Sequence, residues 1–378
     1  MTREKIIQGL YRGDSRAIKE AIKTLEQEPC EDAVSKNGGR RIKMLNVLSL
    51  FSGIGAFEKA LSNLNIPYNL LAYCEIDKYA SKSYSAIHGV SEELNLQDVT
   101  KVDSLDILDD VDFVSYGFPC QDISSAGKQR GFTDEEGNRT RSGLFFEALR
   151  IIEELQPKFA IAENVKALTS KKFTEEFKTV LESLEEAGYN NYWQVLNAKD
   201  YGIPQNRERV FIVSIRKDID KGFTFPKPIP LELRLKDLLE DEVDEKYYLS
   251  EKKLEKLTYS MEIKNMEHIG TYQYGESDKF MQGKSRFIEN KRISDCLQTR
   301  QKEGMVLDNN GNIRIRKLTP TECYKLQGFT AEDCKKASEA GVSNSQLYKQ
   351  AGNSICVSVL EAIYKSLGER YDEFKPLS

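Results

Sequence analysis

A cysteine on a short loop is the residue of this chain best suited to covalent chemistry. Cys120 lies in the sequence Tyr-Gly-Phe-Pro-Cys-Gln, directly after an apolar stretch at residues 111–116 that is predicted to be a strand. In open α/β sheets ligands bind beyond the carboxyl ends of strands, so Cys120 is expected to face the crevice. Most cysteines are inert core residues, but a position between Pro119 and Gln121 on a loop favours a reactive thiol.

Charged residues follow further predicted strands. Glu163 lies in the sequence Ala-Glu-Asn-Val after an apolar stretch at residues 159–162. An isolated glutamate in such a place is by default a cap for the segment that follows. Arg207 and Arg209 alternate in the sequence Pro-Gln-Asn-Arg-Glu-Arg, so they would point to one face of an extended chain. Taken singly, these residues are ordinary surface charge.

A glycine-containing turn follows the first predicted strand. In Phe51-Ser-Gly53-Ile-Gly55 two glycines let the backbone approach a ligand closely. The third glycine of a dinucleotide fingerprint is missing because Glu58 occupies its place, and G-x-G alone is nearly as typical of a turn without a ligand. Glu75, at the end of the second predicted strand, could accept hydrogen bonds from two ribose hydroxyls. The pair favours an adenosine ligand without a pyrophosphate, which S-adenosylmethionine fits.

Composition excludes several other kinds of catalysis. The chain has only two histidines, His88 and His268, which argues against Ser-His-Asp triads, Cys-His dyads and histidine-rich metal sites. Its seven cysteines are scattered without a C-x-x-C pair, which argues against a zinc ribbon or a disulfide framework. The sequence shows neither a secretory signal nor eighteen consecutive apolar residues. A reducing cytoplasm is the expected location.

Strands and helices alternate along the chain and must position these residues. The predicted strands are residues 45–51, 70–74, 111–116, 159–162, 192–198 and 209–215, and the predicted helices are residues 56–64, 78–87, 144–155 and 173–187. This alternation predicts a mostly parallel sheet covered on both faces. After Arg216 the pattern dissolves, and it returns in a final helix at residues 354–367. An amphipathic helix is predicted at residues 14–26, ahead of the first strand.

Net charge is −5, which argues mildly against a nucleic-acid partner, but the charge is unevenly distributed. Residues 279–325 contain eleven basic and five acidic residues, a net charge of +6. A solvated face and a phosphate-binding surface are about equally compatible with this excess.

Together and in this order, the segments resemble those of the bacterial and phage DNA cytosine-5 methyltransferases. The resemblance runs from about Leu45 to the C-terminus, and its blocks are Phe51–Gly55, Glu75 with Asp77, Gly117–Gln121, Glu163–Val165, Gln205–Arg209 and Gly352–Ser354, with a further block from Arg316 to Phe329. Each block is short, but their joint order and spacing are specific. Two departures are Gln97, where a glycine is common, and Lys325, where an arginine is frequent.

The resemblance implies a covalent mechanism. The Cys120 thiolate would attack C6 of a flipped-out cytosine, which breaks aromaticity and makes C5 nucleophilic. Glu163 would bind N3 and the exocyclic amino group, Arg209 would hold O2, and Arg207 would support the loop. A mobile loop at residues 122–141 would close over the base.

The resemblance also implies the cofactor. S-adenosylmethionine would donate the methyl group and leave as S-adenosylhomocysteine, with no metal. In the implied pocket Asp98 would accept from the adenine amino group and Ile76 would pack on the adenine face. The residues expected to line it are Phe51, Gly53, Gly55, Glu75, Ile76, Asp98, Pro119, Asn353 and Ser354.

The implied architecture is a Rossmann-like, S-adenosylmethionine-dependent methyltransferase sheet with a second, smaller and irregular domain. Residues 45–215 plus 340–378 would form the catalytic and cofactor-binding domain, residues 216–339 the target-recognition domain, and residues 1–44 a helical N-terminal extension. The expected partner is double-stranded DNA, with no membrane, and the protein is expected to be a monomer in a bacterial or phage-infected cell. A restriction endonuclease acting on the same site would be a further partner. The sequence does not identify the DNA target.

Two other functions compete with this interpretation. The tRNA-methylating branch of the same family shares the fold and the cysteine, but the Phe-Pro-Cys-Gln-Asp-Ile-Ser context and the length of the variable region favour the DNA enzymes. A DNA-binding regulator would use residues 1–44, but one predicted helix is too little for a helix-turn-helix. Repression that survives Cys120→Ala would indicate a second role without displacing the first.

Overall fold

The computed structural model describes residues 44–102, 108, 110–119, 141–248, 250, 271–272, 287–288, 293–294, 296–297, 305–307 and 315–377. Cys120, the predicted helix at residues 14–26 and the predicted loop at residues 122–141 (apart from the backbone of Arg141) lie outside the described residues. The chain divides into two compact units, one comprising Met1–Leu196, Glu208–Lys227 and Val359–Ser378, and the other Asn197–Arg207 and Pro228–Ser358. The assignment of functions to domains stays a prediction, because compactness alone assigns no function.

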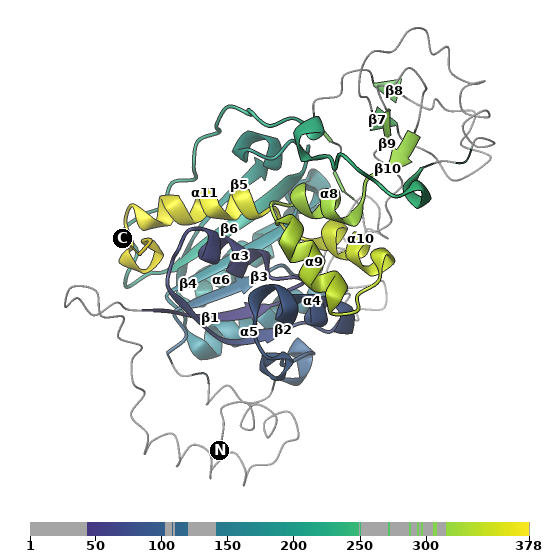
Figure 1. Cartoon of the computed structure of the whole chain (residues 1–378). Coiled ribbons are helices and arrows are strands. Elements are labelled where there is room, and N and C mark those ends of the chain that lie inside the picture. The colour runs from purple at the N-terminus through teal and green to yellow at the C-terminus, as the bar shows by residue number, and fades with distance from the viewer. Residues whose placement is uncertain are drawn as a thin grey trace. The chain divides into compact units, whose positions relative to one another are not determined.

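The first unit is built on a six-stranded sheet, visible in Figure 1. Its strands are β1 (Leu45–Leu50), β2 (Tyr68–Cys74), β3 (Phe113–Tyr116), β4 (Phe159–Val165), β5 (Tyr189–Asn197) and β6 (Glu208–Arg216), arranged in the order β2-β1-β3-β4-β6-β5. The pairs β1–β2, β1–β3 and β3–β4 are parallel, and β4–β6 is antiparallel. The predicted mostly parallel α/β sheet is confirmed.

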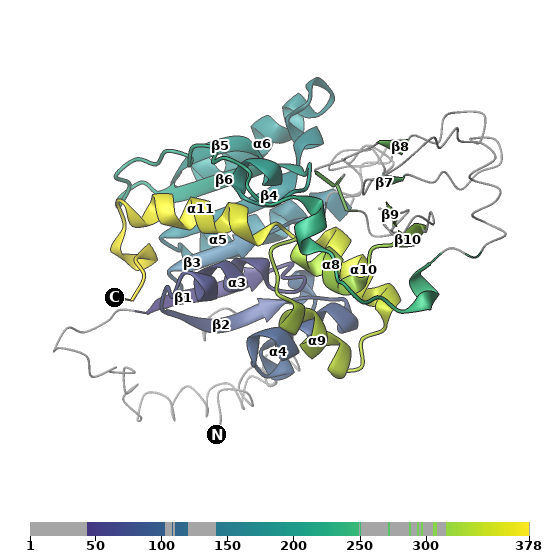
Figure 2. The same ribbon diagram turned by 45° about the horizontal axis from the view of Figure 1, so that its top comes forward.

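Helices cover both faces of this sheet (Figure 2). They are α3 (Ala56–Asn63), α4 (Lys78–His88), α5 (Phe145–Leu155), α6 (Thr174–Glu186) and α11 (Val357–Gly368). Short 3₁₀ turns lie between elements of this unit: η1 (Glu92–Leu94), η2 (Val99–Lys101), η3 (Arg141–Leu144), η4 (Lys166–Thr169), η5 (Lys171–Phe173) and η9 (Asp372–Phe374). A further turn, η6 (Ala198–Tyr201), belongs to the second unit. Each of these five helices coincides with a predicted one to within three residues at either end.

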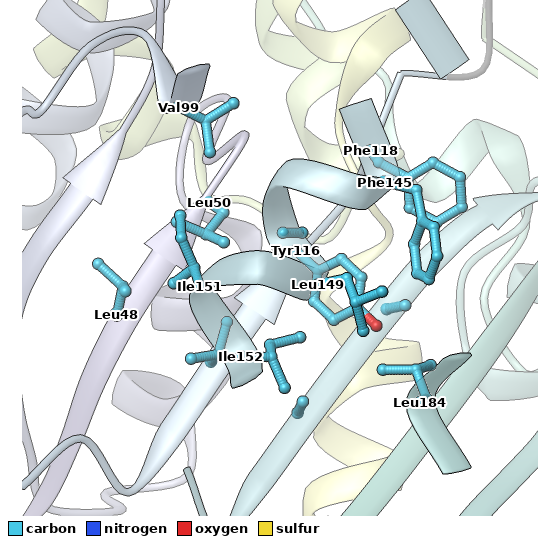
Figure 3. Close-up of a cluster of buried hydrophobic side chains, with 14 of the residues drawn as sticks. Leu48, Leu50, Val99, Tyr116, Phe118, Phe145, Leu149, Ile151, Ile152 and Leu184 are labelled. Atoms are coloured by element: carbon cyan, nitrogen blue, oxygen red, sulfur yellow. The ribbon is translucent and has the colours of Figure 1, made fainter. Parts of the chain in front are cut away.

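Alternation along the strands divides the core into two layers. Leu48 and Leu50 of β1 and Tyr116 of β3 belong to a buried apolar cluster with Phe145 and Ile152 of α5 (Figure 3). On the other side of the sheet, aromatic rings pack in T-shaped contacts, with the edge of one ring against the plane of the next. Phe113 of β3 lies 6.0 Å from the Tyr364 ring of α11 and 6.5 Å from the Phe57 ring of α3, centroid to centroid. These layers hold the carboxyl ends of the central strands in fixed register.

The second unit contains short helices that the sequence pattern did not predict. These helices are α8 (Pro320–Lys325), α9 (Ala331–Glu339) and α10 (Asn344–Asn353). The unit also contains the 3₁₀ turns η7 (Leu235–Leu238) and η8 (Glu245–Tyr247). Two small two-stranded sheets pair β7 (Thr271–Tyr272) with β8 (Phe287–Ile288) and β9 (Met305–Leu307) with β10 (Ile315–Lys317). Helices α8 and α9 each begin with a capping box, Thr319 with Glu322 and Thr330 with Asp333. Such a box is a sequence signal that locates short helices even where apolar periodicity is weak.

Candidate active site

The strand register brings four predicted site segments to one edge of the sheet. Leu50 of β1 pairs with Cys74 of β2 and with Tyr116 of β3, and Tyr116 pairs with Ala162 of β4. The next residues along these four parallel strands are Glu75, Phe51, Gly117 and Glu163. Neighbouring strands are about 4.8 Å apart, so these segments continue from the sheet side by side. The chain order also reverses between β1 and β3, which is where open α/β sheets bind ligands.

The turn after β1 depends on a glycine at one position. Gly55 has φ +78°, and a Cβ there would lie 2.1 Å from His88 Nε2. That imidazole is held in place because its Nε2 lies 3.1 Å from the Ile54 carbonyl oxygen. Gly53 has φ +58°, but a Cβ on it would meet no described atom within 4 Å. Gly55 is therefore required by close packing, whereas the side of Gly53 on which a Cβ would lie faces open space.

Glu75 organises this turn from the end of β2. Its Oε2 accepts the Gly53 backbone N–H at 2.8 Å, and its Oε1 accepts the Asp77 N–H at 2.7 Å. Asp77 in turn caps helix α4 by accepting from the Tyr79 N–H at 2.9 Å. Ile76, between the two acids, is 75% exposed. The structure thus places an oriented carboxylate next along the chain to an exposed apolar side chain, and the assignment of these two residues to ribose and adenine stays a prediction.

Asp98 follows in the same unit, at the start of η2. Its Oδ1 accepts from the Thr100 N–H at 3.1 Å and from the Thr100 hydroxyl at 2.8 Å, which fixes the carboxylate. Gln97, at a position where glycine is common in the family that the chain resembles, has φ +60°. This conformation favours glycine, which gives a physical reason for glycine to be common there, and Gln97 adopts the same left-handed backbone.

Glu163 and Arg209 lie on neighbouring antiparallel strands and form an ion pair. The Arg209 Nε lies 3.0 Å from Glu163 Oε1, and the two side chains are 17% and 12% exposed. Strand β4 continues past Ala162 to Val165, so Glu163 lies within a strand rather than after it. The helix-cap alternative is therefore excluded, because Glu163 is held in the β4–β6 ladder opposite Phe211.

Asn164 connects this strand to the segment that leads to Cys120. Its Nδ2 donates to the Phe118 carbonyl oxygen at 3.1 Å, and both residues are buried. Pro119 follows Phe118 and is half-buried. Sequence reasoning included Asn164 in a family block but gave it no role, since an asparagine at a strand end has no distinctive pattern.

Arg207, Asn353 and Ser354 lie in the second unit. Arg207 is 3% exposed, and its guanidinium donates to the carbonyl oxygens of Gly352 at 3.0 Å and Ser354 at 2.6 Å. It also donates to the Leu297 carbonyl oxygen and the Cys296 Sγ, both at 3.2 Å. Helix α10 ends at Asn353, so the arginine satisfies carbonyl groups on both sides of that residue at a helix C-terminus. These contacts are those of a positioning residue.

Part of the basic excess at residues 279–325 is internal. Arg316 is 4% exposed, and its two terminal nitrogens lie 2.8 and 2.7 Å from the two carboxylate oxygens of Glu322, which is fully buried. Arg316 therefore contributes to the fold of this unit rather than to a phosphate-binding surface. Lys317, next to it, is exposed.

One buried carboxyl lies close to the glycine turn. Glu58, in the first turn of α3, is 1% exposed, and neither of its oxygens has a hydrogen-bond partner within the described ranges. Burial raises the pKa of Glu58 from 4.5 to about 7, and the nearby Ser49 and Tyr84 hydroxyls, which do not reach hydrogen-bonding geometry, offset only part of this rise. The sequence identified Glu58 only as the residue that replaces a third glycine.

The described part of the chain contains no helix long and apolar enough to cross a membrane.

Fold and site together define a class of protein. Residues 45–369 match the family model described as C-5 cytosine-specific DNA methylase, and the chain belongs to this family. Among its relatives, the orphan methyltransferase M.SPBetaI of Bacillus phage SPbeta is 34% identical over 86% of this chain and 98% of its own length. The type II methyltransferase M2.ScrFI of Lactococcus lactis subsp. cremoris is 36% identical over 86% of this chain and 99% of its own length. The predicted family is confirmed, and with it the enzyme class, a DNA (cytosine-5) methyltransferase.

Solved structures agree on the fold. A Dnmt2 methyltransferase of S. pombe superimposes with a TM-score of 0.62 at 23% identity, over 86% of this chain and 98% of its own. A protein described as a DNA modification methyltransferase encoded within a prophage of E. coli superimposes with a TM-score of 0.61 at 22% identity, over 86% of this chain and 99% of its own. The predicted Rossmann-like methyltransferase fold is confirmed.

Proposed function

We propose that this enzyme transfers a methyl group from S-adenosylmethionine to C5 of a flipped-out cytosine within a short specific sequence of double-stranded DNA, through a covalent bond between Cys120 and C6. The observation that chiefly supports this is the hydrogen bond from Asn164 to the Phe118 carbonyl. It fixes the backbone two residues before Cys120 to the strand that contains Glu163. A nucleophile and the groups that recognise its substrate need such a fixed relation.

The chain's own residues divide the chemistry of the base between them. Addition of the Cys120 thiolate to C6 breaks the aromaticity of the ring and places negative charge toward N3 and O2, while C5 becomes nucleophilic. Glu163 accepts from the exocyclic amino group and, in its protonated form, donates to N3, while Arg209 balances charge at O2. After methylation of C5, a base removes the C5 proton, and the thiolate leaves as the double bond re-forms. The Glu163–Arg209 pair pre-orients both groups before DNA binds.

The residues present fit an adenosyl ligand. Glu75 is oriented by two backbone N–H groups, a Cβ on Gly53 would meet open space, and Ile76 is exposed for a ring to pack on. Phe51, Gly55 and Asp98 belong to the same unit, and Pro119, Asn353 and Ser354 are assigned to this ligand by the resemblance alone. S-adenosylmethionine, when bound, supplies the methyl group that the activated C5 accepts, and no metal has a role.

Access to the base requires that it leave the helix stack. Residues 122–141 are proposed to close over the flipped cytosine, and residues 216–339 to read the sequence of the duplex through base edges. The enzyme is proposed to act as a monomer in the bacterial cytoplasm. A restriction endonuclease that cuts the same sequence is a further proposed partner.

The test is bisulfite or enzymatic methylome sequencing of plasmid DNA from cells that express the protein. Methylated cytosines in one short motif are expected from the wild type, none from Cys120→Ala, and the wild-type pattern from Cys334→Ala, which removes a thiol in helix α9. Cys120→Ala should still bind S-adenosylhomocysteine. Normal methylation by Cys120→Ala would refute the assignment of Cys120 as the nucleophile. Methylation of RNA, with no DNA methylation in any sample, would refute the assignment of DNA as the substrate.

A further inference from the structure

The side chain of Asn95 uses every hydrogen-bonding group it has. Its Oδ1 accepts the backbone N–H of Glu75 at 2.9 Å and that of Gln97 at 2.8 Å. Its Nδ2 donates to the Glu75 carbonyl oxygen and to the Ser81 hydroxyl, both at 2.9 Å. A primary amide has two lone pairs and two N–H groups, so Asn95 is saturated. If the amide were flipped, its N–H groups would face the backbone N–H groups of Glu75 and Gln97, and its oxygen would face the Glu75 carbonyl oxygen.

These contacts join the two loops that hold the proposed adenosine-binding acids. Two of the hydrogen bonds hold the backbone N–H and carbonyl groups of Glu75. A third holds the backbone N–H of Gln97, the left-handed residue that precedes Asp98. The Glu75 carboxylate is oriented from its other side by Gly53 and Asp77. A single side chain therefore ties the backbone of Glu75 to that of Gln97, the residue before Asp98.

We infer that Asn95 is a positioning residue for cofactor binding, which holds Glu75 and Asp98 at the separation that an adenosyl group requires. The inference rests on the proposed function of these two acids. Among the described residues the Asn95 side chain hydrogen-bonds only to Glu75, Gln97 and Ser81, so its removal should affect cofactor affinity rather than the chemical step.

The backbone around Asn95 is held without its side chain. The Leu96 N–H donates to the Tyr73 carbonyl oxygen at 2.7 Å, and Asn95 forms a parallel bridge with Tyr73 on the edge strand β2. An alanine at residue 95 keeps these bonds. An aspartate also keeps the acceptor oxygens, but it loses both donors and places negative charge against the Glu75 carbonyl.

The experiment compares wild type, Asn95→Ala and Asn95→Asp, with Asn69→Ala as the matched control. Asn69 lies at the other end of β2 and donates from its side chain to Asn46 Oδ1 at 3.1 Å. S-adenosylhomocysteine binding is measured by calorimetry, and kcat and KM by transfer of labelled methyl to DNA. Both Asn95 variants are expected to raise the Kd for S-adenosylhomocysteine and the KM for S-adenosylmethionine by about 10- to 100-fold, by analogy with the removal of groups that orient the ligands of a metal. The kcat and the KM for DNA are expected to stay within about threefold of wild type.

The outcomes separate the two proposals. If wild type binds no S-adenosylhomocysteine, the proposed cofactor is wrong. If wild type binds it and both Asn95 variants bind equally well, the positioning role is wrong while the cofactor stands. A fall in kcat with unchanged KM, as a partly unfolded enzyme would give, also overturns the positioning role, and circular dichroism of Asn95→Asp identifies that case.

Discussion

Glu163 and Arg209 are joined by a 3.0 Å ion pair between two antiparallel strands, with Arg209 two ladder positions from the residue opposite Glu163. Residues so placed share one face of a sheet, and their side chains meet diagonally. Each is mostly buried, so loss of either leaves the other as a poorly compensated charge. The pair is therefore expected to act as one unit in substrate binding and catalysis.

Substitution of this pair should give non-additive losses. Glu163→Gln keeps the shape of the side chain and is expected to lower the single-turnover methylation rate by at least about 100-fold, the size of a lost acid–base group. Arg209→Ala should give a similar loss, and the double variant should be little worse than the poorer single one. Glu182→Gln, which breaks the exposed Lys178–Glu182 pair on helix α6, is the control and should leave the rate unchanged. Additive losses, or a change in DNA affinity alone, would contradict the paired role.

Arg207 should stabilise the enzyme and its cofactor site together. Arg207→Lys keeps the charge, but a single ammonium group cannot replace a fork that reaches the carbonyls of Gly352, Ser354 and Leu297. We expect the free energy of unfolding to fall by about 2–4 kcal/mol because buried carbonyls lose their partners. The KM for S-adenosylmethionine should also rise, since Asn353 and Ser354 are proposed to contact it. Denaturant unfolding and methylation kinetics test both, and an unchanged unfolding midpoint would show that these contacts contribute nothing.

The sheet was predictable because each of its elements has a strong local pattern. Buried parallel strands such as β1 are short apolar runs, and the turns after them contain glycine or proline. For the same reason Glu75, Gly53 and Cys120 could be selected as residues that follow strands. The short helix α8 was missed because only six residues form it, too few for apolar periodicity to show.

Residues that act through the backbone were much harder to find. Asn95 lies in a polar stretch and has the sequence character of a surface residue. Its role depends on backbone groups of Glu75 and Gln97, which come together only when β2 and the turn after η1 are folded. Arg207 was placed in a family block, but its buried contacts with a helix end far along the chain have no sequence signal at all.

The two glycines of the first turn should respond differently to alanine. Gly55→Ala would bring a Cβ to 2.1 Å from His88 Nε2 at φ +78°, so we expect a loss of at least about 2 kcal/mol in the free energy of unfolding. Gly53→Ala, at φ +58° with open space, should cost about 1 kcal/mol and instead weaken S-adenosylhomocysteine binding. Thermal unfolding and calorimetry compare the two variants. Equal effects of both substitutions on stability and on affinity would contradict the different roles.

Glu58 makes the stability of the fold depend on pH. Its pKa is about 7 in the folded protein against 4.5 for the free side chain, so between these pH values the native state holds a proton that the unfolded state releases. Stability from this group is complete below pH 4.5 and is lost as pH rises to about 7. The shift corresponds to a loss of about 3 kcal/mol.

Glu58→Gln should remove this dependence, because an amide of the same size stays neutral at every pH. The free energy of unfolding of the variant minus that of wild type is expected to increase by about 3 kcal/mol between pH 4.5 and pH 7.5 and to change little above that. Glu93→Gln, at an exposed carboxylate in η1, is the matched control and should show no such trend. Urea unfolding at several pH values measures both. If the difference in the free energy of unfolding between variant and wild type stays constant from pH 4.5 to pH 7.5, the prediction is wrong. Glu58 would then ionise in the folded protein as it does in water, through a rearrangement that admits solvent to helix α3.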